Sequence, residues 1–248
     1  KRFIIMKITH YLYNAFIIEW DDKKLAIDPG ALFAYWFSFA SLIPKEEWND
    51  ITHIFVTHGD PDHYWHVDRV SKASGAPIIF NKTMIKEVDG KKLMLGPRSK
   101  GLAFDTPISN FFTLSVDESI EADGMKIKGV KSTHGPITIK LGPIKKTETP
   151  GPNERIARGN MGFEITYNGK TIVNLGDSLL EAIEWKKIKN PDVLMIPIGG
   201  KKIENTMDEI DAIKAVKIIQ PKLVIPMHYN CPVLFTRKGN PADDLMFK

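Results

Sequence analysis

The stretch HGDPDH, residues 58–63, is the most informative part of this 248-residue chain, because it places four potential metal ligands within six positions. An apolar run with the composition of a buried strand, residues 50–57, precedes it, and a run with helical spacing, residues 63–74, follows it. Gly59 permits a tight backbone, and Pro61 stiffens the turn before the helix. Side chains that would alternate along a strand can therefore converge in this strand-to-helix loop.

A plainer interpretation of this loop is helix capping. Aspartate is common at the start of a helix, so Asp60 and Asp62 would act as caps and the two histidines would be incidental. Three further candidates weigh against that interpretation, because each comes directly after a predicted strand. They are His134, Asp177 and His228. Taken singly, each would more often be a core or capping residue, but with the loop they form a set at the C-terminal ends of strands.

Strand-rich and helix-rich stretches appear in two rounds along the chain. Residues 3–28 predict a β-meander, and Asp123-Gly124 and Asn168-Gly169 predict tight hairpins. Further strands are expected at residues 77–80, 192–198 and 222–228, helices at 83–90, 179–188 and 207–219, and a long loop at 135–160. The pattern predicts one domain over residues 1–248 with two similar halves, an α/β fold of two facing sheets with helices outside, which is a four-layer αββα sandwich.

Composition limits the class of protein and its partners. Hydrophobic residues make up 43% and charged residues 26%, and the net charge of +4 arises from 34 basic and 30 acidic residues. This small excess favours no nucleic acid partner, but it tolerates an anionic small-molecule substrate. Cys231 is the only cysteine, which fits a reducing cytoplasm. The longest apolar stretch, residues 31–43, is shorter than the roughly 20 residues of a membrane span, so none is expected, and a homo-oligomer is left open.

The order of HxDxDH, a single His, GDS and a final PMHY resembles the metallo-β-lactamase superfamily, over nearly the whole chain. The stretches KIT, NAFIIE and LAIDPG and the closing TMDEIDAIKAVKIIQPKLVIPMHYN are similar to the ascorbate-6-phosphate lactonase-like branch of metal-dependent hydrolases. The resemblance implies the metallo-β-lactamase type of sandwich with a binuclear metal site. By position, it implies that His58, Asp60 and His134 hold the first metal, that Asp62, His63 and His228 hold the second, and that Asp177 bridges them. Asp28 matches a supporting carboxylate that orients the ligands.

Two positions depart from the family pattern. The family usually has His where Asp60 stands, and the lactonase-like branch usually has His near Tyr13. A carboxylate in place of an imidazole makes the first site harder and more anionic, which shifts its preference from zinc toward manganese or iron. We therefore expect two divalent ions, zinc or manganese, with iron as the alternative. Flavodiiron oxidoreductases of this superfamily place Glu there, but they carry a flavodoxin domain that is absent from these 248 residues.

The resemblance implies a metal-dependent hydrolase that uses a metal-activated hydroxide on a small ester, lactone or phosphoester. Asp62 would orient the hydroxide as well as bind metal. A diiron or iron oxidoreductase is the first alternative, favoured by Asp60. A nuclease is the second, and the weak basic excess supports it poorly.

The parts that would contact substrate are less well defined. Tyr229, next to His228, would donate a hydrogen bond to substrate or pack in the core. Trp36 belongs to an aromatic segment, residues 31–48, that would line the pocket or form a core or subunit contact. A basic loop would line the pocket or be a solvated surface, and its residues are Lys140, Lys145, Lys146, Arg155 and Arg158.

Overall fold

The computed structural model describes residues 6–31, 39–96, 98–99, 102–141, 144–151, 156–202, 204–232 and 238–247. The chain divides into two compact units. Unit 1 comprises Lys1–Ser115 and Ala157–Gly159, and unit 2 comprises Val116–Ile156 and Asn160–Lys248. The single domain expected over residues 1–248 stays a prediction. In the described part of the chain, every helix is too short or too polar to cross a membrane.

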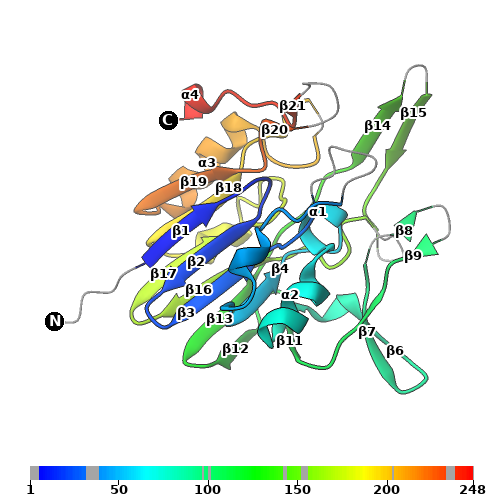
Figure 1. The fold of residues 1–248 in the computed structure, drawn as a ribbon. Helices are drawn as coiled ribbons and strands as arrows, with labels where there is room; N and C mark the ends of the chain where they lie inside the picture. Colours follow the sequence, from blue (N-terminus) through cyan, green and yellow to red (C-terminus); the bar gives the residue numbers. More distant parts are fainter. Residues whose placement is uncertain are drawn as a thin grey trace. The chain divides into compact units, whose positions relative to one another are not determined.

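Unit 1 is built on a six-stranded sheet in the order β1-β2-β3-β4-β5-β11 (Figure 1). Its first three strands form the predicted antiparallel meander, and the next three pairings are parallel. The strands are β1 (Met6–His10), β2 (Phe16–Trp20), β3 (Lys23–Ile27), β4 (His53–Val56), β5 (Ile78–Asn81) and β11 (Phe111–Leu114). A 3₁₀ turn, η1 (Lys45–Glu47), precedes β4, and α1 (Pro61–Tyr64) and α2 (Val67–Ser74) follow it. All four residues of β4 are buried, as the apolar run predicts.

A smaller three-stranded sheet completes unit 1, in the order β10-β7-β6. The helix expected at residues 83–90 is wrong. A short 3₁₀ turn, η2 (Lys82–Met84), leads instead into a hairpin of β6 (Ile85–Val88) and β7 (Lys91–Met94). Asp89 and Gly90 adopt φ angles of 50° and 70°, so this Asp-Gly pair makes the turn of a hairpin. The remaining short strands are β8 (Arg98–Ser99), β9 (Leu102–Ala103) and β10 (Thr106–Pro107).

Unit 2 repeats this plan, with a six-stranded sheet in the order β12-β13-β16-β17-β18-β19. The first three pairings are antiparallel and the last two are parallel. The strands are β12 (Ser119–Ala122), β13 (Met125–Val130), β16 (Gly162–Tyr167), β17 (Lys170–Asn174), β18 (Val193–Pro197) and β19 (Leu223–Met227). Both predicted hairpins are confirmed, since Asp123-Gly124 and Asn168-Gly169 have the positive φ angles that such turns need.

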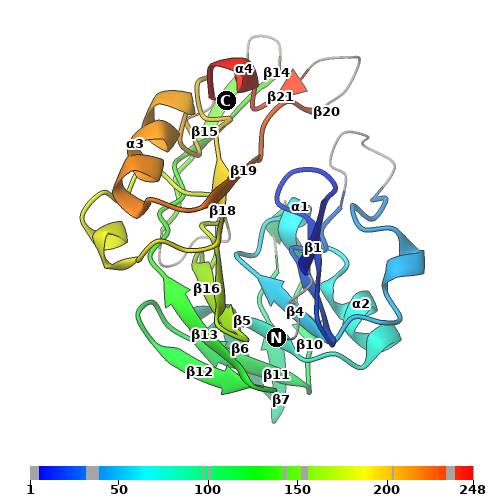
Figure 2. The same ribbon diagram turned by 90° about the vertical axis from the view of Figure 1, so that its left-hand side faces the viewer.

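One long helix, α3 (Glu209–Ile219), covers a face of the unit 2 sheet (Figure 2). Its buried side chains Ala212, Ala215 and Ile219 join the apolar cluster of β18. The helix expected at residues 179–188 is wrong, because only a 3₁₀ turn, η3 (Glu184–Lys187), forms there. The long loop expected at residues 135–160 is partly wrong, since β14 (Ile137–Leu141) and β15 (Ile144–Glu148) pair within it. The chain ends with β20 (Cys231–Pro232), β21 (Lys238–Gly239) and α4 (Asp244–Phe247).

Candidate metal centre

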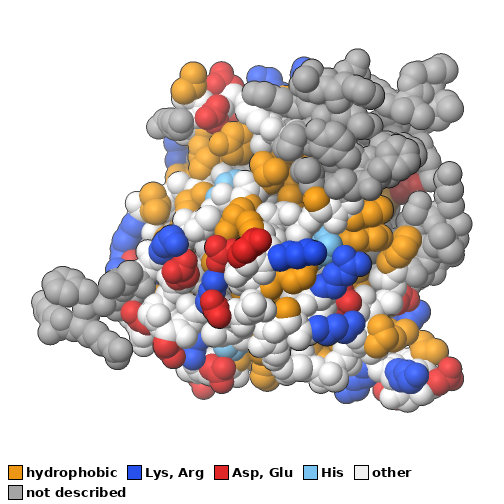
Figure 3. Space-filling model, viewed as in Figure 1, with side chains coloured by type: hydrophobic (Ala, Val, Ile, Leu, Met, Phe, Trp, Pro, Cys, Tyr) orange, Lys and Arg blue, Asp and Glu red, His pale blue; other side chains and the backbone are white. Residues whose placement is uncertain are grey.

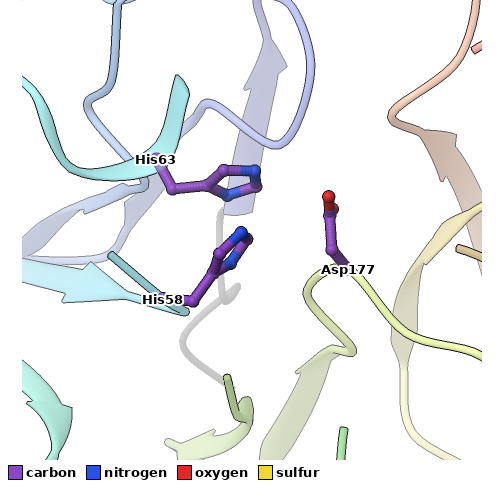
Figure 4. Close-up of side chains that lie close together, drawn as sticks. All are labelled: His58, His63 and Asp177. Atoms are coloured by element: carbon purple, nitrogen blue, oxygen red, sulfur yellow. The ribbon is translucent and has the colours of Figure 1, made fainter. Parts of the chain in front are cut away.

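Four predicted ligands lie together in unit 1, directly after β4 and within α1. The Nε2 atom of His58 lies 3.4 Å from Oδ2 of Asp60, and the Nε2 atom of His63 lies 3.4 Å from Oδ2 of Asp62. The two imidazole rings lie next to each other, with centroids 3.9 Å apart (Figure 4). Two ligand atoms bound at about 2.1 Å to one tetrahedral ion are about 3.4 Å apart. The spacing within this unit 1 half-site therefore suits atoms that share a cation.

The side chain of Asp60 does not cap the helix. Asp60 occupies the N-cap position of α1, yet its side chain makes no capping hydrogen bond. Its Oδ1 atom accepts a hydrogen bond of 2.9 Å from the backbone amide of Ala157, and its Oδ2 atom faces His58. The amides of His63 and Tyr64 bond instead to the Asp60 backbone carbonyl. The capping interpretation therefore does not account for the position of this carboxylate.

Asp28 holds one imidazole of the unit 1 half-site in place. It follows β3 with a φ angle of 47° and is completely buried. Its Oδ2 atom lies 2.7 Å from Nδ1 of His63 and accepts hydrogen bonds from the Thr57 hydroxyl and the Asn14 amide, while Oδ1 accepts from the Thr57 backbone amide. An imidazole that donates from Nδ1 to a carboxylate keeps the lone pair of Nε2 for a metal. This is the geometry that the expected supporting role of Asp28 requires.

Three predicted ligands lie together in unit 2, and they form the unit 2 half-site. The Oδ2 atom of Asp177 lies 2.9 Å from Nε2 of His228 and 3.6 Å from Nε2 of His134. His134 Nδ1 lies 2.6 Å from the Gly135 carbonyl oxygen, so Nδ1 is the donor and Nε2 retains its lone pair. Asp177 stands on the loop after β17 (Figure 4), and all three ligands are buried. One carboxylate oxygen thus lies close to two imidazoles.

The donor set fits a divalent cation. The seven residues supply four imidazoles and three carboxylates, and groups of His and Asp among them have the ligand-atom spacing that a metal ion needs. Imidazole and carboxylate together suit zinc, manganese or iron. The union of the two half-sites into one binuclear site stays a prediction.

Among the residues predicted to contact substrate, Tyr229 lies in the described part of the chain. Tyr229 is half-buried and packs against the apolar cluster of unit 2. Burial, followed by the nearby Asp244 and Cys231, raises the pKa of Tyr229. Trp36 and Arg155 lie outside the described residues, as do the side chains of Lys140, Lys145 and Lys146.

Sequence reasoning missed the residues that support the ligands. Thr57 and Asn14 bond to Asp28, and Ala157 and Asn160 bond to the ligand loops. Thr57 directly precedes the HGDPDH stretch, and this position was the one available signal. Ala157 acts through its backbone amide, which any residue except proline carries, so residue type could not reveal it.

A family model, the beta-lactamase superfamily domain, matches residues 7–228. The chain therefore belongs to this superfamily. A UPF0173 metal-dependent hydrolase of Alkaliphilus metalliredigens is 31% identical over 231 residues, which cover 91% of this chain and 86% of that relative. This match confirms the predicted class, a metal-dependent hydrolase.

Solved structures agree on the fold. Igni18, a metallo hydrolase from the hyperthermophilic archaeon Ignicoccus hospitalis, matches 98% of this chain and 88% of its own with a TM-score of 0.67 and 24% identity. CmlA, a diiron beta-hydroxylase from Streptomyces venezuelae, matches 97% of this chain and 48% of its own with a TM-score of 0.60 and 12% identity. The predicted α/β sandwich of the metallo-β-lactamase type is confirmed. The ascorbate-6-phosphate lactonase-like branch stays a prediction.

Proposed function

We propose that the two half-sites together hold two divalent metal ions and that the protein hydrolyses a small ester, lactone or phosphoester. Zinc and manganese are the favoured ions. In this proposal, His58, Asp60 and His134 bind the first ion, Asp62, His63 and His228 bind the second, and Asp177 bridges them.

One observation carries the proposal. In both half-sites, imidazole Nε2 atoms face carboxylate oxygens at 2.9 to 3.6 Å, which is the spacing of neighbouring ligands on one ion. In His63 and His134, Nδ1 is hydrogen-bonded to an acceptor, which leaves the lone pair of Nε2 for a metal ion. Divalent ions held there would supply a water of lowered pKa and Lewis acidity toward a carbonyl or phosphoryl oxygen.

The protein's own side chains would have distinct roles. Asp177 suits the bridging position, because a single oxygen, Oδ2, lies near two imidazoles. Asp62 has a side chain that is 19% exposed, compared with 10% for Asp60 and 0% for His63. Asp62 is therefore the carboxylate that water and substrate reach most easily, and we assign it the orientation of the attacking water and acceptance of its proton.

The surface fits a small substrate better than a polyanion. Acidic and basic side chains are interspersed over the face shown in Figure 3. With a net charge of +4, this arrangement tolerates an anionic small molecule and provides little attraction for nucleic acid. A cytoplasmic location belongs to the same proposal, and it is supported by the single cysteine, Cys231.

A diiron or iron oxidoreductase is the second candidate, and Asp60 is the observation that favours it. A carboxylate at this position raises the preference for harder ions such as iron. CmlA, whose fold this chain shares, is named a diiron enzyme, but at 12% identity the likeness extends to the fold alone. The hydrolase remains the leading proposal because the curated relatives are named hydrolases.

The decisive experiment combines metal analysis with a substrate screen. Protein purified without added metal is assayed for zinc, manganese and iron, and then tested on lactones, carboxyl esters, phosphodiesters and reducible substrates. We expect two ions per chain and hydrolytic turnover, and both should be lost in the double variant His63→Ala, Asp177→Ala. The control is His10→Ala, Asp192→Asn, which removes a histidine and an aspartate that are not among the predicted ligands. Wild-type turnover and metal content in the His63, Asp177 variant would overturn the proposal.

A further inference from the structure

We propose that Ala157–Asn160, here called the strap, holds a ligand loop of each half-site in position through hydrogen bonds. The inference rests on the proposed function, because it concerns the same metal ions. In this proposal Ala157 and Asn160 are positioning residues that act through Asp60 and Asp177.

The strap contacts the ligand loop of unit 1 through its backbone. The Ala157 amide donates to Asp60 Oδ1 at 2.9 Å, and the Arg158 carbonyl accepts from the Gly59 amide at 3.0 Å. Gly59 and Asp60 are consecutive residues of the HGDPDH stretch, so the strap is bonded to this loop at two neighbouring positions. The first bond occupies one carboxylate oxygen and leaves Oδ2 toward His58.

The same strap contacts the ligand loops of unit 2 through a side chain. The Asn160 amide nitrogen donates to the Asp177 carbonyl oxygen at 2.8 Å and to the Ser132 hydroxyl oxygen at 2.9 Å. The Ser132 hydroxyl in turn donates to the Asp177 carbonyl at 3.2 Å. Ser132 is two residues before His134, so Asn160 joins the loops that carry two of the three ligands of the unit 2 half-site.

The strap has a constrained backbone. Ala157 and Gly159 adopt φ angles of 49° and 71°. A Cβ atom added at Gly159 would lie 2.2 Å from Cγ of Met84, which shows how closely the backbone of Gly159 packs against this side chain. Three peptide units separate residues 157 and 160, so their Cα atoms are at most about 11 Å apart. The strap residue that bonds to the Asp60 loop and the strap residue that bonds to the Asp177 loop are therefore close neighbours along the chain.

The test is a cobalt titration of the full-length apo-protein, followed by visible absorption and by the number of ions bound. The main variant is Asn160→Ala, which removes both side-chain hydrogen bonds to the unit 2 half-site. The matched control is Asn110→Ala, because Asn110 also donates to a backbone carbonyl, that of Gly75, at an exposed position.

We expect Asn160→Ala to weaken cobalt binding about 10-fold to 100-fold, as loss of a ligand's outer partner does, and to alter the cobalt absorption bands. The control Asn110→Ala should bind cobalt like wild type. If Asn160→Ala does not fold, Ser132→Ala removes the hydroxyl that joins Asn160 to Asp177, and the same loss is expected. If the tested variant, Asn160→Ala or Ser132→Ala, bound cobalt with wild-type affinity and spectrum, the positioning role of the strap would be wrong and the proposed function would be unaffected. A wild-type protein that binds no cobalt would overturn both.

Discussion

Asp28 is placed to orient the imidazole of His63. It is fully buried and bonds to Thr57, Asn14 and His63. In Asp28→Asn, the amide nitrogen would meet groups that donate, so the imidazole would lose its acceptor and its fixed orientation. We expect metal affinity to fall about 10-fold to 100-fold. A zinc titration checks this, and wild-type affinity in Asp28→Asn would rule out the orienting role.

Asp192 is a carboxylate outside the predicted ligand set and offers a pH prediction. Burial alone would raise its pKa, but hydrogen bonds from Lys222, Lys170 and the Thr171 amide outweigh burial and hold the pKa well below 3.8. Because the folded-state pKa is depressed, this stabilisation is present above about pH 4 and is lost as the pH falls further.

We therefore expect Asp192→Asn to lower the free energy of unfolding by about 1 kcal/mol at pH 7, since both lysines are exposed and solvent screens them. The difference from wild type should shrink as the pH falls below 4. Urea unfolding at several pH values measures it, and zinc affinity should be unchanged. A difference that grows toward low pH would contradict the assignment.

At the scale of elements, Gly30 allows α1 to pack closely against the loop that follows β3. A Cβ atom at Gly30 would lie 1.9 Å from the Asp62 carbonyl oxygen, and backbone cannot move aside as a side chain can. Gly30→Ala should therefore displace α1 with Asp62 and His63, lower the free energy of unfolding by at least about 2 kcal/mol, and weaken metal binding.

Gly75→Ala is the matched control, because open space surrounds Gly75 although its φ angle is 75°. It should lose about 1 kcal/mol through backbone strain and bind metal normally. Denaturant unfolding and zinc titration separate the two effects. Equal results for the two variants would show that the close approach of Gly30 to α1 is unimportant.

The elements that could be predicted are those with a local signal. The meander, both hairpin turns and the last strand-helix-strand stretch follow from alternation, Asp-Gly or Asn-Gly pairs and helical spacing. Residues 179–188 were mispredicted because tertiary contacts decide them. The Trp185 indole donates to the Lys131 carbonyl, and the Leu179 amide donates to the Thr133 carbonyl, so packing and bonding near β13 override helical propensity.

Candidate ligands could be chosen from the sequence, but the residues that support them could not. His and Asp at strand ends are chemically distinctive, so the seven ligand candidates could be picked from the sequence. The hydrogen bonds to Asp60 and Asp177 come from the strap, which is 97 residues from the first and 17 from the second. Such distant partners, one of them a backbone amide, leave no pattern in one sequence.

At the scale of the whole molecule, metal binding should stabilise the fold. The predicted ligands are spread over residues 58–228 and can bind the same ions only in the folded chain. Bound ions therefore favour the folded state. At a free metal concentration 100 times the dissociation constant, one ion adds about 2.7 kcal/mol. A chelator should therefore lower the melting temperature of wild type and leave that of His63→Ala, Asp177→Ala almost unchanged. If the chelator lowered the melting temperature of both proteins equally, metal binding would not depend on His63 and Asp177.

The most direct test is a crystal structure of the protein soaked with zinc or manganese, with anomalous diffraction to locate the ions. The proposal predicts two anomalous peaks about 3.5 to 4 Å apart. Each peak should be bound by ligands of both half-sites, with Asp177 contacting both. Peaks held by residues of one unit alone, or no peak beside the HGDPDH loop, would contradict it.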